Sequence, residues 1–200
     1  MKETEAMWAG KFGDEYQARS PGNVEANVEL FKKVFHFEPT SLIEFGAGSG
    51  NNLRAISQLY PKCELAAVEL NTEALKAQPD DIEQFKMSML DYVPLKQFEV
   101  AMTKGLLIHI HPDDLPKAYK VLYESSSKWI LMCEYFSPQR RMIPYRGEND
   151  KLWAADFAAE IMALYPDLEL IQYGFTYHLD GQDDITFFLL SKQVKQDYGI

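Results

Sequence analysis

The feature that most constrains the fold is a glycine-rich turn within residues 41–52, which read SLIEFGAGSGNN. A short apolar run passes through Glu44 directly into Gly46-Ala47-Gly48-Ser49-Gly50, and the segment that follows is compatible with a helix. Glycine permits the backbone angles of a tight turn, and the N–H groups at the start of a helix attract polar ligand groups. The sequence therefore predicts a strand, a turn and a helix N-terminus that bind a ligand through bare backbone amides. The alternative is a turn that serves only as a tight connection.

A second acidic residue narrows the kind of ligand. Glu69 ends the next apolar run, 65–68, at about the 20-residue spacing of a carboxylate that binds ribose at the tip of a second strand. The alternative is an ordinary exposed acid. Together the turn and Glu69 favour a ligand that contains a nucleoside.

The glycine spacing favours S-adenosylmethionine (SAM) over a dinucleotide. The dinucleotide pattern G-x-G-x-x-G would place its third glycine at position 51, which is Asn51. Glu44 lies two residues before the first glycine, where it would repel a pyrophosphate and suit the ammonium group of SAM. The turn resembles motif I of the Rossmann-like methyltransferases, so methyl transfer is favoured over NAD-dependent oxidoreduction.

Composition limits the partners. The 200 residues are 46% hydrophobic and 25% charged, which is typical of one globular domain with a sizeable core. A net charge of −10 argues against nucleic acid and against an anionic membrane surface. No apolar run approaches a membrane span, and the start of the chain lacks the apolar core of a signal peptide. Cys63 and Cys133 lie far apart, as expected of free thiols, and we expect a cytoplasmic protein.

Strand-like and helix-like segments alternate through the middle of the chain, with strands expected at 41–45, 64–69, 83–87, 98–103 and 129–136, and helices at 51–59, 72–77 and 114–127. This alternation predicts an α/β fold with a Rossmann-like, seven-stranded, mainly parallel sheet and helices on both faces. Segments 168–177 and 184–192 read as an antiparallel pair at the edge of the sheet, so the C-terminal strand is expected to be antiparallel. The ligand site is expected at the carboxyl ends of the parallel strands.

Two further segments complete the expected single domain, residues 1–200. Residues 1–36 look helical and carry Trp8, Phe12 and Tyr16 on one helical face. This stripe is either a core face or part of a lid, in which Tyr16 and Arg19 would hold the methionine carboxylate of SAM. Residues 137–165 form an acceptor-side insertion, with a helix expected over 150–165.

Several local strings resemble a known family, namely WAGKFGDEY (8–16), the glycine turn, TKGLLIHIHP (103–112), IPYRG (143–147), DFAAE (156–160) and DDITFFLL (183–190). The chain resembles the small SAM-dependent methylases associated with pseudaminic acid biosynthesis. The resemblance implies SAM as the cofactor. It also implies a small polar acceptor, such as a sugar or nucleotide sugar used in nonulosonic acid and glycan biosynthesis.

The cofactor would contact residues from each strand end. Glu69 would accept both ribose hydroxyls and Leu70 would pack on adenine, while Ser88 and the Met89 amide would read the adenine edge. Asp91 either joins them or caps a turn. The complete predicted set is Glu44, Gly46, Ala47, Gly48, Asn51, Glu69, Leu70, Ser88, Met89, Lys104, Tyr16 and Arg19.

His109, Glu134 and Tyr145 are the candidate catalytic residues. His109 is either a general base, since its ordinary pKa lies near neutrality, or a residue that packs under the cofactor. Glu134 and Tyr145 are expected to border the acceptor. No metal is expected, because the histidines outside 109–111 are remote in sequence and the acidic pairs lie where turns and helix starts favour Asp.

Arg146, Tyr177 and Asp184 are the candidate substrate-binding residues. A guanidinium binds a carboxylate or phosphate through two parallel hydrogen bonds, so Arg146 is expected to clamp an anionic acceptor. Two alternatives to this function stay open. One is a non-catalytic SAM-fold partner of a glycosylation enzyme, and the other is a methyltransferase that acts on a different small metabolite.

Overall fold

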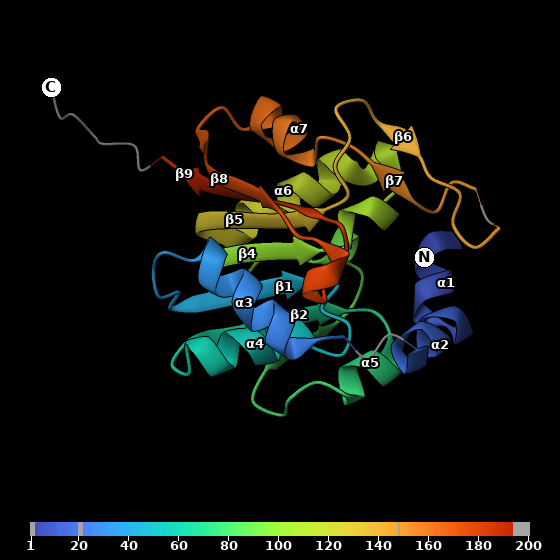
Figure 1. The fold of residues 1–200 in the computed structure, drawn as a ribbon, viewed down its shortest axis with the longest axis horizontal. Coiled ribbons are helices and arrows are strands. Elements are labelled where there is room, and N and C mark those ends of the chain that lie inside the picture. Colours follow the sequence, from blue (N-terminus) through green and yellow to red (C-terminus); the bar gives the residue numbers. More distant parts are fainter. Residues whose placement is uncertain (1–2, 20–21, 148, 194–200) are drawn as a thin grey trace, which may run out of the picture.

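The computed structural model describes residues 3–19, 22–147 and 149–193 (Figure 1). Its helices are α1 (Glu3–Ala9), α2 (Lys11–Arg19), α3 (Val24–Val34), α4 (Asn51–Leu59), α5 (Thr72–Lys76), α6 (Leu115–Ser125) and α7 (Phe157–Leu164). Its strands are β1 (Ser41–Phe45), β2 (Glu64–Glu69), β3 (Glu83–Lys86), β4 (Phe98–Lys104), β5 (Ser126–Glu134), β6 (Arg141–Met142), β7 (Trp153–Ala154), β8 (Leu168–Phe175) and β9 (Thr186–Lys192). Short 3-10 turns include η1 (Met89–Asp91) and η2 (Leu107–His109).

One sheet of seven strands has the order β3-β2-β1-β4-β5-β9-β8. The first five strands pair in parallel, whereas β9 runs antiparallel to both of its neighbours, β5 and β8. This arrangement confirms the predicted mainly parallel sheet with an antiparallel C-terminal strand. The carboxyl ends of β1, β2, β4 and β5 therefore meet at one edge, where α1 and α2 lie (Figure 1).

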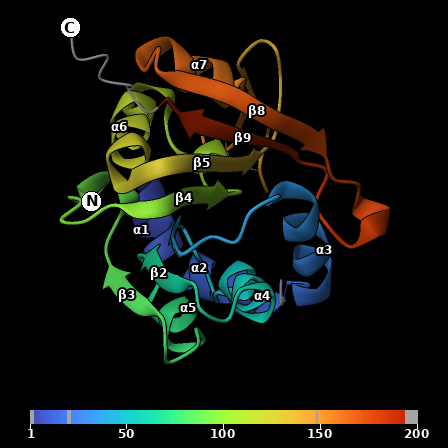
Figure 2. The ribbon, with the colours of Figure 1, turned by 90° about the vertical axis from the view of Figure 1, so that its left-hand side faces the viewer.

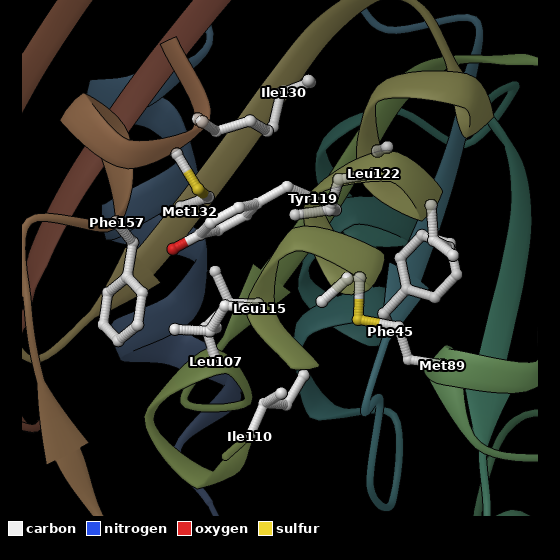
Figure 3. Close-up of a cluster of buried hydrophobic side chains, with 14 of the residues drawn as sticks. Phe45, Met89, Leu107, Ile110, Leu115, Tyr119, Leu122, Ile130, Met132 and Phe157 are labelled. Carbon is white, nitrogen blue, oxygen red and sulfur yellow. The ribbon is translucent and has the colours of Figure 1, made fainter. Parts of the chain in front are cut away.

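Helices cover both faces of this sheet, with α3 on one side and α6 on the other (Figure 2). α3 and α4 pack against each other over one face, and their apolar residues share a core with Leu131 and Leu189 of the sheet. α6 and α7 bury a second core on the opposite face. Tyr119 of α6 lies within that core (Figure 3), and its hydroxyl donates to Glu160 at 2.7 Å, so this buried hydroxyl group is hydrogen-bonded.

The helix expected over 150–165 is wrong in its first half. Trp153 and Ala154 are buried and pair with Arg141 and Met142 as the two-stranded ladder of β6 and β7. The helix α7 begins only at Phe157, because Asp156 caps it by accepting a hydrogen bond from the Ala159 N–H at 2.9 Å. In the described ranges, no helix is long and apolar enough to cross a membrane.

Candidate functional site

The glycine turn connects β1 to α4 in a conformation that favours glycine. Gly46, Gly48 and Gly50 have φ angles of 69°, 53° and 79°. The Gly46 N–H donates to the Val68 carbonyl at 2.8 Å, which ties the turn to the end of β2. A Cβ atom at Gly46 would lie 2.8 Å from Leu106 Cδ1. The turn therefore needs both the left-handed angles and the small size of glycine.

Glu69 is held against this turn at the end of β2. Its Oε2 accepts from the Gly48 N–H at 2.8 Å, and its Oε1 accepts from the Asn71 N–H at 2.8 Å. The side chain is only 9% exposed, and burial raises its pKa above the ordinary value. Two backbone donors thus fix the carboxylate at a strand tip, as the sequence predicts for a ribose-binding acid.

Two adjoining cavities open at this edge of the sheet. The first, of about 190 Å³, lies between the strand ends and α1, and its wall includes segments 68–71, 87–90 and 104–106. The second, of about 480 Å³, lies toward residues 181–185 and the N-terminal part of α3. Both cavities are lined by Tyr16, Gln17, Gly46, Gly48, Lys104, Gly105 and His109, so they share one wall.

Most of the predicted cofactor-binding residues lie on these walls. The first cavity is lined by Tyr16, Gly46, Gly48, Glu69, Leu70, Ser88, Met89 and Lys104, and the second also contacts Ala47 and Asn51. Asp91 instead lies outside the cavity walls, exposed and 3.8 Å from the Lys117 ammonium. The turn at 89–91 is capped by Ser88, whose hydroxyl accepts from the Leu90 N–H.

Glu44 and Arg19 differ from the rest of the predicted set, because neither is among the residues that line the two cavities. Glu44 is fully buried behind the turn and accepts from Asn52 Nδ2 at 2.6 Å. Burial raises the pKa of Glu44 to about 8. Arg19 is exposed at the end of α2, with its guanidinium over the rings of Phe12 and Tyr16. β1 is a central strand whose two faces are both covered, so the Glu44 side chain is buried in the interior rather than at the ligand site that its sequence position suggests.

His109 is a neutral side chain packed beneath the lid. Its Nδ1 lies 2.8 Å from the Lys151 carbonyl oxygen, and since a carbonyl only accepts, Nδ1 carries the hydrogen. Its ring lies 4.7 Å from the Trp8 ring and 5.4 Å from the Tyr145 ring. Burial lowers the pKa of His109 to about 4. This geometry favours the packing role over that of a general base.

Glu134, which the sequence predicts to border the acceptor, is not among the residues that line the cavities. It is 3% exposed at the end of β5, and its carboxylate accepts from the N–H groups of Leu106 and Leu107 at 3.2 Å and of Ile108 at 3.4 Å. Burial raises its pKa to about 7. Glu134 therefore holds the turn that carries His109. Its influence on the cavities is indirect, through the position of that turn.

The predicted acceptor residues are dispersed. Tyr145 lines the second cavity, whereas Arg146 is exposed, with a φ of 53° and its guanidinium 5.7 Å from the Tyr145 ring centre. Tyr177 is 44% exposed and lies beside His178. Asp184 accepts from the His178 N–H at 2.8 Å and borders a third cavity of about 390 Å³. Hydrogen bonds from His178 lower the pKa of Asp184. Only Tyr145 among these four lines the second cavity.

Of the segment 1–36 that is expected to form a lid, α1 and α2 line the first cavity, whereas α3 packs on the sheet, and we use the word lid for α1 and α2 alone. Residues 1, 2, 20 and 21 of the expected lid lie outside the described residues. Asn71, which the sequence analysis missed, joins the lid to β2. Its Nδ2 donates to the Trp8 carbonyl at 3.1 Å and to Asp14 Oδ1 at 2.8 Å, and its Oδ1 caps α5. The sequence signal for Asn71 is its place directly before a helical segment, which is typical of a helix N-cap.

Further residues of the second cavity were also missed. Gln182 donates to Asn27 Oδ1 at 3.0 Å across 155 residues of sequence, and both side chains line the cavity beside Tyr135 and Asp183. Local pattern gave no signal for this cluster. In the ranges that the structure describes, no group of three or more His, Cys, Asp or Glu side chains is placed to hold a metal ion.

Solved structures of other proteins share this architecture. The 1,6-didemethyltoxoflavin-N1-methyltransferase of Burkholderia thailandensis, solved with 1,6-didemethyltoxoflavin and S-adenosylhomocysteine (SAH), matches with a TM-score of 0.70 and 13% identity over 91% of this chain and 84% of that chain. The chain has the fold of the class I SAM-dependent methyltransferases.

Two further solved structures support the same fold. Streptomyces venezuelae DesVI matches with a TM-score of 0.68 and 11% identity, over 92% of this chain and 99% of that chain. The glycopeptide N-methyltransferase MtfA, solved with SAM, matches with a TM-score of 0.64 and 14% identity, over 86% of this chain and 95% of that chain. No protein-family model and no curated protein matches the sequence.

Proposed function

We propose that this protein transfers a methyl group from SAM to a small polar acceptor. The observation that carries the proposal is the shared wall of the two cavities at Gly46, Lys104, Gly105 and His109. A donor in the first cavity and an acceptor in the second would meet at this wall. Methyl transfer is an in-line displacement, so holding the two reactants in contact supplies much of the catalysis.

The residues of the first cavity suit the adenosine part of SAM. Glu69 presents a carboxylate fixed by two N–H groups, and a carboxylate accepts hydrogen bonds from a ribose diol. Leu70 and Met89 offer apolar surface for the base. SAM, when bound, supplies the methyl group and its own leaving group, while the turn and Lys104-Gly105 would position the methionine end.

The second cavity suits a hydroxylated acceptor. Asn27, Gln182 and the hydroxyl groups of Tyr135 and Tyr145 combine hydrogen-bond donors and acceptors, which match the hydroxyl groups of a sugar. The family resemblance supports a sugar or nucleotide sugar of nonulosonic (pseudaminic) acid biosynthesis. Arg146, beside Tyr145, remains our proposed contact for a carboxylate or phosphate. The free thiols of Cys63 and Cys133 suit a cytoplasmic location.

Calorimetric titration with SAM and with SAH tests the donor. We expect both to bind at a single site, and failure of both to bind overturns the proposal. Incubating the protein with isotopically labelled SAM and a pool of nucleotide sugars, followed by mass spectrometry, tests the acceptor. Labelled product is expected. Binding of SAM without formation of SAH in any pool would instead favour a non-catalytic partner of a glycosylation enzyme.

A further inference from the structure

The base end of the first cavity is built partly by the lid. Glu5 of α1 lines this cavity together with Ser88 and Met89, although more than 80 positions separate them along the chain. The Ser88 hydroxyl donates a hydrogen bond to Glu5 Oε1 and accepts one from the Leu90 N–H at 3.1 Å. A lid carboxylate therefore stands at the position where the sequence predicts Ser88 to read adenine.

The donors and acceptors at this position favour Glu5 over Ser88 as the reader of the base. A hydroxyl has a single hydrogen, and Ser88 gives its hydrogen to Glu5. The 6-amino group of adenine is a donor and needs an acceptor. A carboxylate has two oxygens, each of which can accept more than one hydrogen bond, so the bond from Ser88 is compatible with a further bond from the 6-amino group.

We infer that Glu5 accepts the hydrogen bond of the adenine 6-amino group, so that the lid itself selects the base of the cofactor. The inference rests on the proposed function, because it assumes that adenosine occupies the first cavity. Ser88 then acts as a positioning residue, since its hydroxyl orients the Glu5 carboxylate.

The lid is held in place from both sides. Asn71, whose N–H donates to Glu69, also donates through its side chain to the Trp8 carbonyl and to Asp14. At the other end of α1, Glu3 Oε1 lies 3.3 Å from the Lys151 ammonium. Asn71 thus joins the residue predicted to bind ribose to the helix α1 that carries Glu5, and these contacts order Glu5 before a ligand enters.

The test compares SAH with its deaminated analogue, S-inosylhomocysteine, in which a carbonyl replaces the 6-amino group. Glu5→Gln should reduce the preference of the wild-type protein for SAH by about 10- to 100-fold, because a charge-assisted hydrogen bond is lost and the new amide can donate to the 6-carbonyl. Glu5→Ala should weaken SAH binding and also reduce the preference. Any contribution of the Met89 N–H is common to all variants, so the change in the ratio isolates Glu5.

Glu15→Gln is the matched control, because Glu15 lies on the other helix of the lid, is exposed and is not among the cavity-lining residues. This variant should keep the wild-type ratio. Circular dichroism should show that all three variants are folded. An unchanged ratio in both Glu5 variants overturns the inference while leaving the proposed function intact. Failure of the wild-type protein to bind SAH overturns the proposed function instead.

Discussion

At the scale of single residues, the site contains or adjoins three buried carboxylates that differ in their hydrogen-bond partners and surroundings. Glu69 faces the first cavity and accepts a hydrogen bond from the glycine turn, whereas Glu134 holds the turn before His109, and Glu44 of β1 is enclosed against Asn52 of α4. The same residue type therefore serves as a proposed ligand contact, a positioning group and an interior polar group. Each of these roles predicts a different phenotype.

Replacing Glu69 should weaken the binding of SAM and SAH. Glu69→Ala removes the charge-assisted acceptor of the ribose hydroxyls, and we expect a loss of at least about 10-fold in affinity by calorimetry. Glu73→Ala is the control, since Glu73 is exposed on neighbouring α5 and pairs with Lys76. Wild-type affinity in Glu69→Ala would contradict the proposed site.

Glu44 should make stability depend on pH. Its folded-state pKa is raised from 4.5 to about 8, so the folded protein binds the proton more tightly than the unfolded chain does. The stabilisation is complete below the unfolded pKa and is lost as the pH rises through the folded pKa. Urea denaturation of wild type should show stability falling between pH 4.5 and 8 relative to Glu44→Gln, which cannot titrate. Parallel curves for the two proteins would refute this prediction.

Glu134 should affect the turn rather than the chemistry. In Glu134→Gln an NH₂ group replaces one of the oxygens that face three backbone N–H groups, at a cost of about 1–3 kcal/mol in unfolding free energy. We expect a lower urea midpoint, with SAH affinity changing less than in Glu69→Ala. A normal midpoint together with abolished methyl transfer would indicate instead that Glu134 contacts the acceptor.

At the scale of elements, the lid is joined by ring contacts to the cavity wall. Trp8 lies 5.2 Å from Phe12, 5.2 Å from Tyr16 and 4.7 Å from His109, measured between ring centres. The stripe that the sequence left open between a core face and a lid therefore packs against the cavity wall, which favours the lid. Its own helices are short, so tertiary contacts supply most of their stability.

Trp8→Ala should loosen α1 and α2 without unfolding the domain. We expect faster proteolysis near the N-terminus, weaker SAH binding and a nearly unchanged thermal midpoint. Lys11→Ala, at an exposed position of α2, is the control and should match wild type in all three measurements. A large drop in the midpoint would show that the lid is part of the global folding unit.

The helices and strands that the sequence predicts correctly are those whose ends are marked by clear local sequence signals. The strands 41–45 and 64–69 and the helix 51–59 agree with the structure, since the glycine turn and the apolar runs define their ends. The segment 150–155 has no such signal. Its strand β7 exists only because Arg141 and Met142 lie alongside it, a contact that sequence periodicity does not encode.

At the scale of the whole molecule, topology explains which parts of the site were predictable. Glu69 and the glycine turn follow from the rule that parallel strands end at one edge. The pairs Glu5–Ser88 and Asn27–Gln182 form because the lid and the 181–185 loop fold back over that edge of the sheet. No local sequence pattern specifies this tertiary arrangement.

Ligand binding should stabilise the entire domain. A ligand present at 100 times its dissociation constant contributes about 2.7 kcal/mol, which corresponds to a rise of roughly 5–10 °C in the thermal midpoint of a domain of this size. We expect this shift with SAH and none with NAD⁺, measured by differential scanning fluorimetry. A rise in the thermal midpoint with NAD⁺ alone would instead favour an NAD-dependent oxidoreductase.

The position of β9 has a consequence for biosynthesis. β9 lies between β5 and β8 in space but follows both in sequence. During translation, the ribosome therefore releases β5 and β8 before the strand that joins them. Until residues 186–192 emerge, β5 presents an unpaired edge that invites pairing with other chains. The nascent protein is therefore prone to aggregation until β9 has been synthesised and pairs with β5.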